Sequence, residues 1–174
     1  LQGDAAILDI LRRCGAVFTR TAEGISFEKA PLHGVDIDLA DCPDLGPILF
    51  TLGCFCSGET VITNAGRLRL KESDRIEAMR DELQKMGARI EVDGDTVHIQ
   101  GVALHAPNAP LSGHNDHRIV MALAVAAIAS GLPALLCGAE AVDKSWPAFW
   151  NVLRGLGAKV ELSTDKTNEF DIKA

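Results

Sequence analysis

The chain has 174 residues, enough for one domain with its own hydrophobic core. Apolar residues make up 47% of the sequence and charged residues 24%, a balance typical of globular proteins. The net charge of −7 argues against a nucleic-acid-binding surface, so any anion site must be a local cluster of cations. The longest apolar run, residues 119–129, is too short to span a bilayer and indicates a buried helix. We therefore expect neither a nucleic acid nor a membrane as a partner.

The cysteines and the start of the chain indicate a compartment. An odd number of cysteines without disulfide-type spacing fits a reducing environment, and no secretory signal opens the chain, so we expect a cytoplasmic protein. Cys54 and Cys56 lie in an apolar run and are expected to be small buried side chains rather than metal or redox groups. The first residue is Leu1 rather than Met, which indicates a fragment or a processed form.

The first part of the chain predicts a helix followed by a hairpin. Residues 7–14 carry apolar side chains at helical spacing, and Gly15 follows them where a left-handed cap is expected. Residues 17–19 and 25–27 alternate in polarity, which is typical of strands, and the pair at 23–24 is a hairpin turn signal.

The middle of the chain predicts a buried helix, two strands and an amphipathic helix. Residues 47–57 are apolar on nearly every side, and a short apolar strand follows at 60–62. Residues 67–71 alternate between basic and apolar side chains, so we expect a strand with its three cations on one side. Ser73 is a candidate N-cap, with Asp74 in the first turn, of an amphipathic helix that Arg75 opens and whose apolar stripe runs from Ile76 to Met86. The remaining predicted elements are strands at 89–92 and 97–99, a helix at 118–130, a strand at 134–136, a helix at 146–156, and strands at 159–162 and 170–172.

The same order of elements recurs along the chain. Gly15, Gly87 and Gly157 each follow an amphipathic helix and precede an alternating strand. The two apolar helices both end in Ser-Gly, at Ser57 and Ser130, which are 73 residues apart. Each full unit therefore reads helix, strand, helix, strand, strand, and the first unit lacks its front part. This pattern predicts an α+β domain built from copies of one unit, with the apolar helices at its centre and the sheets outside.

Polar residues fall at matching places in this repeat. An acidic residue, Asp44 or Asp116, precedes the first helix of each full unit, and a lysine, Lys71 or Lys144, precedes the second. Helix N-termini favour anions, because their N–H groups are unpaired and the helix dipole is positive there. The polar run at 115–118 abuts an apolar helix, so its side chains need partners if they are buried. The N-termini can converge, which predicts an anion site at one end of the domain.

Three motifs stand at these helix starts: Arg69-Leu70-Lys71-Glu72-Ser73-Asp74-Arg75, Asn115-Asp116-His117-Arg118 and Asp143-Lys144-Ser145-Trp146-Pro147. In this order, they closely resemble the motifs of the 5-enolpyruvylshikimate-3-phosphate synthase (EPSP synthase) family. The resemblance extends over nearly the whole chain, to about Leu162.

The resemblance implies a fold and a reaction. The fold would be an inside-out α/β barrel of repeated βαβαββ units, with buried helices and sheets outside. Residues 1–174 would form a single domain that matches only the second, C-terminal domain of the family, with a poorly matching tail at 163–174. The absent N-terminal domain is the expected protein partner. The implied reaction transfers the enolpyruvyl group of phosphoenolpyruvate to the 5-hydroxyl of shikimate 3-phosphate and releases phosphate, without a metal or an organic cofactor.

The resemblance also implies roles for individual residues. Asp44 would bind and help deprotonate the hydroxyl, Glu72 would protonate the methylene carbon, and Lys71 would contact both substrates. His117 would be a catalytic residue that either orients Asp116 or shuttles a proton. The expected phosphoenolpyruvate-binding residues are Lys71, Arg75, Asp116, Arg118 and Lys144. The expected contacts to shikimate 3-phosphate are Asp44, Lys71 and Arg67, the last at a position where some family members have asparagine.

Other interpretations remain open at this point. The carboxylates could be helix caps, and the cations could be partners in local ion pairs. UDP-N-acetylglucosamine enolpyruvyl transferase has the same fold and donor, but it lacks the elements seen here at 71–75 and 115–118. A third alternative is a non-catalytic domain of the same fold. Because half of the active-site wall is expected to lie in the absent domain, we expect the isolated chain to be inactive.

Overall fold

The computed structural model describes residues 3–162 and 169–173. The helices, with η marking 3-10 helices, are η1 (Gly3–Ala6), α1 (Ile7–Arg13), η2 (Pro43–Leu45), α2 (Gly46–Phe55), η3 (Ala65–Leu70), α3 (Arg75–Gln84), α4 (His117–Ser130), η4 (Ala139–Lys144) and α5 (Phe149–Gly155). The strands are β1 (Val17–Thr21), β2 (Gly24–Glu28), β3 (Asp36–Asp38), β4 (Glu59–Thr63), β5 (Arg89–Asp93), β6 (Thr96–Gln100), β7 (Leu111–Ser112), β8 (Ala134–Cys137), β9 (Lys159–Leu162) and β10 (Glu169–Lys173). Within the described ranges, no helix is long and apolar enough to cross a membrane.

Two four-stranded sheets have the same topology. Their strand orders are β3-β4-β6-β5 and β7-β8-β10-β9. In each sheet the first pair is parallel and the other two pairs are antiparallel. The hairpin of β1 and β2 forms a separate two-stranded sheet. The structure confirms the predicted repeat, because the two full units build equivalent sheets and the first unit supplies only the hairpin.

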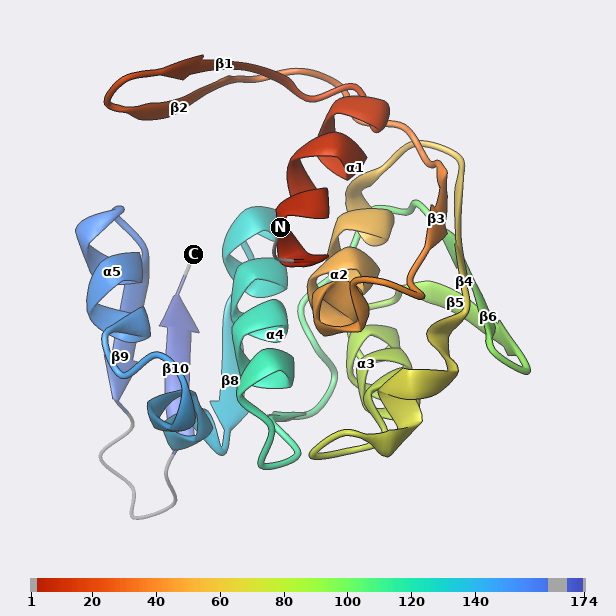
Figure 1. Ribbon diagram of the computed structural model, residues 1–174. Coiled ribbons are helices and arrows are strands. Elements are labelled where there is room, and N and C mark those ends of the chain that lie inside the picture. Colours follow the sequence, from red (N-terminus) through yellow and green to blue (C-terminus); the bar gives the residue numbers. More distant parts are fainter. Residues whose placement is uncertain (1–2, 163–168, 174) are drawn as a thin grey trace.

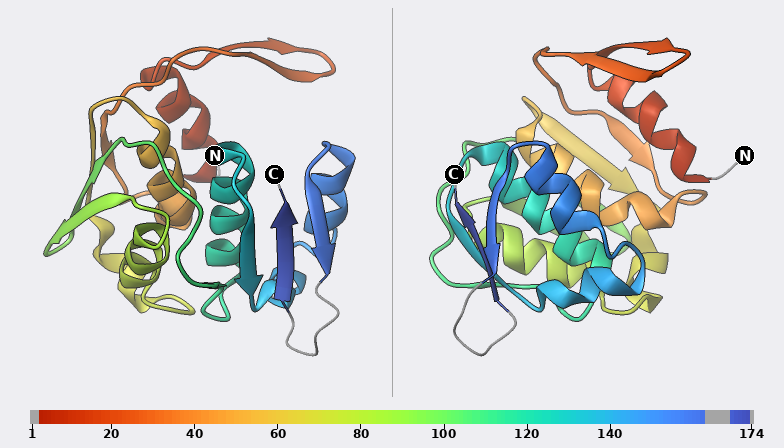
Figure 2. Two further views of the ribbon diagram at one scale, coloured as in Figure 1. Left: turned by 180° about the vertical axis from the view of Figure 1, so that it is seen from behind. Right: turned by 90° about the vertical axis from the view of Figure 1, so that its left-hand side faces the viewer.

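The apolar helices lie in the middle of the molecule. Helices α2, α3 and α4 pack together between the two four-stranded sheets, as views from the front and the back show (Figures 1 and 2). Leu49 and Phe50 of α2 and Leu123 of α4 are fully buried. The hydroxyl of Thr51 donates a buried 3.0 Å hydrogen bond to the carbonyl of Ala122, which joins α2 to α4. The predicted α+β class and the buried position of the apolar helices are confirmed.

Glycine ends the three amphipathic helices as expected. Gly15, Gly87 and Gly157 have φ angles of +97°, +86° and +94°, in the left-handed region that side chains with a Cβ rarely adopt. The predicted last strand is confirmed as β10, which pairs with both β8 and β9. The rest of the predicted tail, 163–168 and 174, and residues 1–2 at the start lie outside the described residues.

The expected strand at 67–71 is wrong. Residues 65–70 form the 3-10 helix η3, which the chain enters through Asn64 in a left-handed conformation with φ of 56°. Leu68 is fully buried, whereas Leu70 is 86% exposed, so the alternation of basic and apolar residues does not mark the two faces of a strand. The backbone N–H of Ala65 bonds to the carbonyl of Asp95, which holds the chain in this turn after β4.

The start of α3 also differs from the prediction. Asp74, rather than Ser73, is the N-cap, and its carboxylate accepts bonds from the N–H groups of Ile76 and Glu77 at 3.1 and 3.2 Å. The hydroxyl of Ser73 instead donates to Asp116, 3.1 Å away. A residue predicted to stabilise one helix end therefore connects two helix starts.

The predicted helix at 146–156 is shorter in the structure. Helix α5 begins at Phe149, and only Phe149 and Trp150 within it are buried. Trp146 precedes Pro147, and the residue before a proline is disfavoured in the helical conformation. Trp146 is 45% exposed and Leu156, past the helix end, is 78% exposed, so the two ends of the expected apolar stripe do not pack in the core.

Candidate active site

Charged residues from four separate segments meet at the starts of the helices. They come from η2, from the turn between η3 and α3, from the start of α4, and from the end of η4. The starts of α3 and α4 lie at the same end of the molecule, the lower end in Figure 1. Ion pairs between 2.8 and 3.6 Å join the segments. The residues brought together are Asp44, Lys71, Glu72, Arg75, Asp116, His117, Arg118 and Lys144.

A buried ion pair lies at the centre of this cluster. Arg75 is 2% exposed and Asp116 is fully buried. The Nε and Nη2 atoms of Arg75 donate to the two carboxylate oxygens of Asp116 at 2.8 and 3.2 Å, a bidentate geometry. Asp116 also caps α4, because it accepts a 2.9 Å bond from the N–H of Arg118. Burial raises the pKa of Asp116, but the hydrogen bond and charge of Arg75 outweigh it, so the pKa lies below its ordinary value.

Asp44 accepts bonds from three cations. Its Oδ1 lies 3.0 Å from Nζ of Lys71 and 3.2 Å from Nη1 of Arg75. Its Oδ2 lies 3.1 Å from Nη2 of Arg118, which also donates through Nη1 to the backbone carbonyl of Asp44. Burial raises the pKa of Asp44, but the Lys71 hydrogen bond and the charges of Arg118, Lys71 and Arg75 bring it below the ordinary value. Asp44 is therefore ionised and is a hydrogen-bond acceptor.

Glu72 lies between an imidazole and an ammonium group. Its Oε1 is 3.2 Å from Nδ1 of His117, and its Oε2 is 3.6 Å from Nζ of Lys144. The imidazole contact is close but lacks hydrogen-bond geometry, since Nδ1 of His117 is buried with no hydrogen-bond partner among the described residues. Lys144 is held by Asn115, to whose carbonyl and side-chain oxygen it donates, the latter at 2.9 Å. The structure thus places His117 against Glu72.

Arg67 is separate from this cluster. Its Nη1 donates to the carbonyl of Ala40 at 3.3 Å. With Arg69, it lines a hollow of about 640 Å³ on the side of η3. Arg69 pairs with Asp74 and Glu77 at 3.0 and 3.1 Å, a structural role that its motif alone does not reveal. The predicted contact of Arg67 with shikimate 3-phosphate stays a prediction.

The donor set does not fit a metal ion. Oxygen or nitrogen atoms of Glu72, Asp116 and His117 lie within 4.8 Å of one another. Both oxygens of Asp116 are already taken by protein donors, and the ammonium group of Lys144 lies beside Glu72. A divalent cation would face these positive charges. The arrangement fits an anion that the cations could share.

Comparison with known proteins identifies the family. The family described as EPSP synthase (3-phosphoshikimate 1-carboxyvinyltransferase) matches residues 1–153. This chain belongs to the EPSP synthase family.

Named relatives agree with this assignment. The chain is 48% identical over 163 residues to a 3-phosphoshikimate 1-carboxyvinyltransferase of Methanocella arvoryzae, with 92% of this chain and 38% of that protein covered. It is 42% identical to the protein of the same name from Clostridium novyi, with 92% and 37% covered. The chain thus spans less than two fifths of the length of these relatives.

Solved structures show the same fold. EPSP synthase from Acinetobacter baumannii superposes with a TM-score of 0.75 at 29% identity, covering 86% of this chain and 38% of that one. The enolpyruvyl transferase NikO from Streptomyces tendae superposes with a TM-score of 0.74 at 24% identity, covering 89% and 35%, and its likeness concerns the fold alone.

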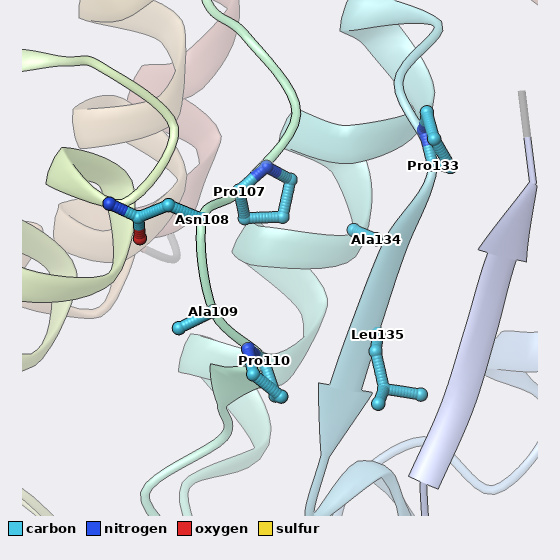
Figure 3. Close-up of a pocket in the computed structure, with 7 residues that line it drawn as sticks. All are labelled: Pro107, Asn108, Ala109, Pro110, Pro133, Ala134 and Leu135. Atoms are coloured by element: carbon cyan, nitrogen blue, oxygen red, sulfur yellow. The ribbon is translucent and has the colours of Figure 1, made fainter.

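Several groups that support the candidate site were not predicted from the sequence. Asn115 holds Lys144, and Ser73 donates to Asp116, whereas the motifs predict no role for Asn115 and only a cap for Ser73. Their position between charged residues at helix starts was an available signal. A hollow of about 280 Å³ between residues 107–110 and β8 is lined by prolines, alanines, Asn108 and Leu135 (Figure 3). Its lining has no charged side chain, so it does not suit a phosphorylated substrate.

Proposed function

We propose that this chain is the C-terminal domain of a 3-phosphoshikimate 1-carboxyvinyltransferase of the shikimate pathway, which serves aromatic amino-acid biosynthesis. The complete protein would transfer the enolpyruvyl group of phosphoenolpyruvate to the 5-hydroxyl of shikimate 3-phosphate. The observation that carries the proposal is the convergence of four cations and three carboxylates at helix starts of a chain whose net charge is −7.

The cations would hold phosphoenolpyruvate. Arg118 and Lys144 have side chains that are 29% and 42% exposed, so an anion can reach them. The side chain of Lys71 is 27% exposed and lies 3.0 Å from Asp44, so it suits contact with both substrates. Arg75 is buried, and its Nη1 points to Asp44, so it would contact the anion through Nη1 on the side of Asp44. Asp116, which is fully buried, would act through Arg75 and Arg118 rather than by touching an anion.

The carboxylates would move the two protons of the reaction. Asp44 would accept the hydrogen bond of the 5-hydroxyl as its oxygen attacks C2 of phosphoenolpyruvate, and Glu72 would deliver a proton to C3. Glu72, now a carboxylate, would then take a proton back from the resulting methyl group as the bond from C2 to phosphate breaks, which restores the double bond. His117 would orient Glu72 or relay its proton, which is supported by the 3.2 Å separation of their side chains. No metal or organic cofactor is needed in this scheme.

The open first unit supports a barrel that is completed from elsewhere in the protein. In the two full units, a strand–helix–strand segment, β3-α2-β4 or β7-α4-β8, precedes the second helix. At the place of a third such segment lies an apolar groove of about 390 Å³ between α1, α2 and α4, with Ile7, Leu52 and Val125 in its lining. The hairpin beside it exposes Val17, Ile25 and Phe27. A third strand–helix–strand segment, from a part of the protein not in this chain, would fill this groove and give the inside-out barrel of three units.

Two other functions are less well supported. A UDP-N-acetylglucosamine enolpyruvyl transferase would use the same donor, but the family match and the named relatives favour shikimate 3-phosphate as the acceptor. We expect the isolated chain to be non-catalytic. It covers only 38% of the Methanocella arvoryzae relative, and the rest of the protein would supply most of the wall that faces shikimate 3-phosphate. Product formation by the purified 174-residue chain would contradict that expectation.

A chimera tests the function directly. This chain replaces the matching segment of the Methanocella arvoryzae relative, and phosphate release is measured with phosphoenolpyruvate and either shikimate 3-phosphate or UDP-N-acetylglucosamine. We expect release only with shikimate 3-phosphate. Glu72→Gln in the chimera should lower kcat by about 10²- to 10⁴-fold, the usual contribution of a general acid. A folded chimera whose rate does not exceed that of its Glu72→Gln variant would refute the proposal.

A further inference from the structure

A second buried carboxylate lies on α3, outside the cluster of substrate-binding candidates. The side chain of Glu82 is 4% exposed. It accepts bonds from Nζ of Lys85 at 2.7 Å and from the backbone N–H of Ser112 at 2.8 Å. Its other oxygen lies 3.0 Å from Nε2 of His114. Burial of a carboxylate costs free energy unless hydrogen bonds satisfy its oxygens, so the three donors must be held in place.

All three donors belong to, or hold, one short segment. Ser112 ends β7, and His114 lies in the connection from β7 to α4. Lys85 also donates to the carbonyl of Pro110 at 3.0 Å. Glu82 therefore holds residues 110–114 at three points: directly at Ser112 and His114, and through Lys85 at Pro110. The segment has little regular structure of its own, because β7 is only two residues long.

The end of this segment has a backbone conformation that needs such support. His114 and Asn115 have φ angles of +49° and +53°, so two successive residues with side chains are left-handed. Each is strained relative to an extended or helical residue and persists where its surroundings fix it. The imidazole bond to Glu82 fixes the first of the two.

The strained residues place the cations of the site. The carbonyl and side-chain oxygens of Asn115 hold Nζ of Lys144. The next residue, Asp116, caps α4 and binds Arg75, and Arg118 is the second residue of that helix. A shift of residues 112–115 would therefore move Lys144 and the start of α4 together.

We propose that Glu82 is a positioning residue for phosphoenolpyruvate binding, which rests on the proposed function of the site. It acts through the 110–115 segment on Lys144 and Arg118 and touches no substrate itself. Because these cations bind the donor substrate before and during the reaction, a loss of their alignment weakens donor binding more than it slows chemistry. Shikimate 3-phosphate is expected to be unaffected, since its candidate contacts lie on other segments.

The variant Glu82→Gln in the chimera tests the proposal. Lys85 and Ser112 share one oxygen of Glu82, and His114 faces the other. Glutamine loses the negative charge opposite Lys85, and while its oxygen faces Lys85 and Ser112, its amide cannot accept a bond from His114. We expect KM for phosphoenolpyruvate to rise by about 10- to 100-fold, the scale of a small misalignment. KM for shikimate 3-phosphate, measured at saturating phosphoenolpyruvate, should be unchanged. Asp81→Asn is the matched control: it makes the same charge change one residue away on a side chain that is 54% exposed. A variant that merely loses folded protein would lower kcat and leave both KM values alone, which would overturn the proposal.

The 174-residue chain gives a second readout that does not depend on turnover. In NMR spectra of the chain, Glu82→Gln should shift the amide resonances of Ser112, Asn115 and Asp116, whereas Asp81→Asn should not.

His114→Gly relieves the left-handed strain while removing one contact, so it stays folded and should raise KM for phosphoenolpyruvate by a smaller factor. Unchanged resonances at 112–116 in Glu82→Gln would refute the positioning role even if the chimera is inactive. An inactive unsubstituted chimera with those shifts present would count against the proposed function alone.

Discussion

Replacing Asp116 by alanine should cost more stability than any other single change at the site. The variant leaves Arg75, 2% exposed, with only its contact to Asp44. Removing one partner of a buried ion pair typically costs about 3–5 kcal/mol. The loss of the N-cap of α4 adds about 1 kcal/mol. We therefore expect the free energy of unfolding to fall by about 4–6 kcal/mol, a large part of the roughly 5–15 kcal/mol that holds a domain folded.

Urea unfolding of the 174-residue chain measures this loss. Trp150 is 6% exposed, so its fluorescence reports on the folded core, and midpoint and slope together give the free energy. Asp74→Asn is the control, because Asp74 caps α3 as Asp116 caps α4. Asparagine caps helices about as well as aspartate, and the pair of Asp74 with Arg69 is partly exposed, so this variant should lose less than about 1 kcal/mol.

A double substitution separates the charge from the packing. Arg75→Met combined with Asp116→Leu removes both charges and fills similar volume, so it should recover much of the stability that Asp116→Ala loses. A loss below about 1.5 kcal/mol in Asp116→Ala would show that the buried pair does not hold the starts of α3 and α4 together. A double variant less stable than Asp116→Ala would refute the account of an uncompensated buried charge.

Three further predictions follow from single features. The pKa of Asp116 is lowered by folding, so the unfolded chain binds more protons than the folded chain as pH falls below about 5, and stability is lost progressively as pH drops toward the folded pKa. The loss should be less steep in Asp116→Asn, and equal slopes of stability against pH for the two chains, measured by urea unfolding, would contradict this. Burial raises the pKa of Cys54 and Cys56 to about 12, so iodoacetamide at about pH 8 should label them slowly in the native chain and quickly in urea, as mass spectrometry can show. Gly101→Ala would place a Cβ 1.6 Å from the carbonyl oxygen of Cys56 and should cost at least about 1–3 kcal/mol in urea unfolding. At Gly155, the last residue of α5 with open space around it, the same change should stabilise by about 0.4–1 kcal/mol.

The repeat and the helix starts could be predicted because they rest on local rules. Helical spacing of apolar residues and the glycines after them located the amphipathic helices, and equal offsets predicted equivalent units. The strand predicted at 67–71 is wrong because alternation of basic and apolar residues is typical of a strand, whereas here Leu68 is buried and Leu70 is not, which fits a 3-10 helix. The role of Glu82 was missed, although its spacing from Met79 and Met86 puts it on the buried face of α3. Two of its three donors, Ser112 and His114, lie 30 and 32 positions further along, which local patterns cannot reveal.

The ion pairs of the site explain why one domain of this family should bind its donor substrate only weakly. Asp44 forms ion pairs with Lys71, Arg75 and Arg118, so an incoming anion must share cations that are already paired. The hydroxyl that would take over as partner of Asp44 belongs to shikimate 3-phosphate, most of whose expected contacts lie in the absent domain. Binding of the acceptor would then free the cations for phosphoenolpyruvate. On this reasoning the affinity of the complete protein for phosphoenolpyruvate rises when shikimate 3-phosphate is bound, and Asp44→Asn weakens that coupling. Calorimetric titration of the chimera with each substrate, alone and with the other present, measures it, and equal affinities in both titrations would refute the competition.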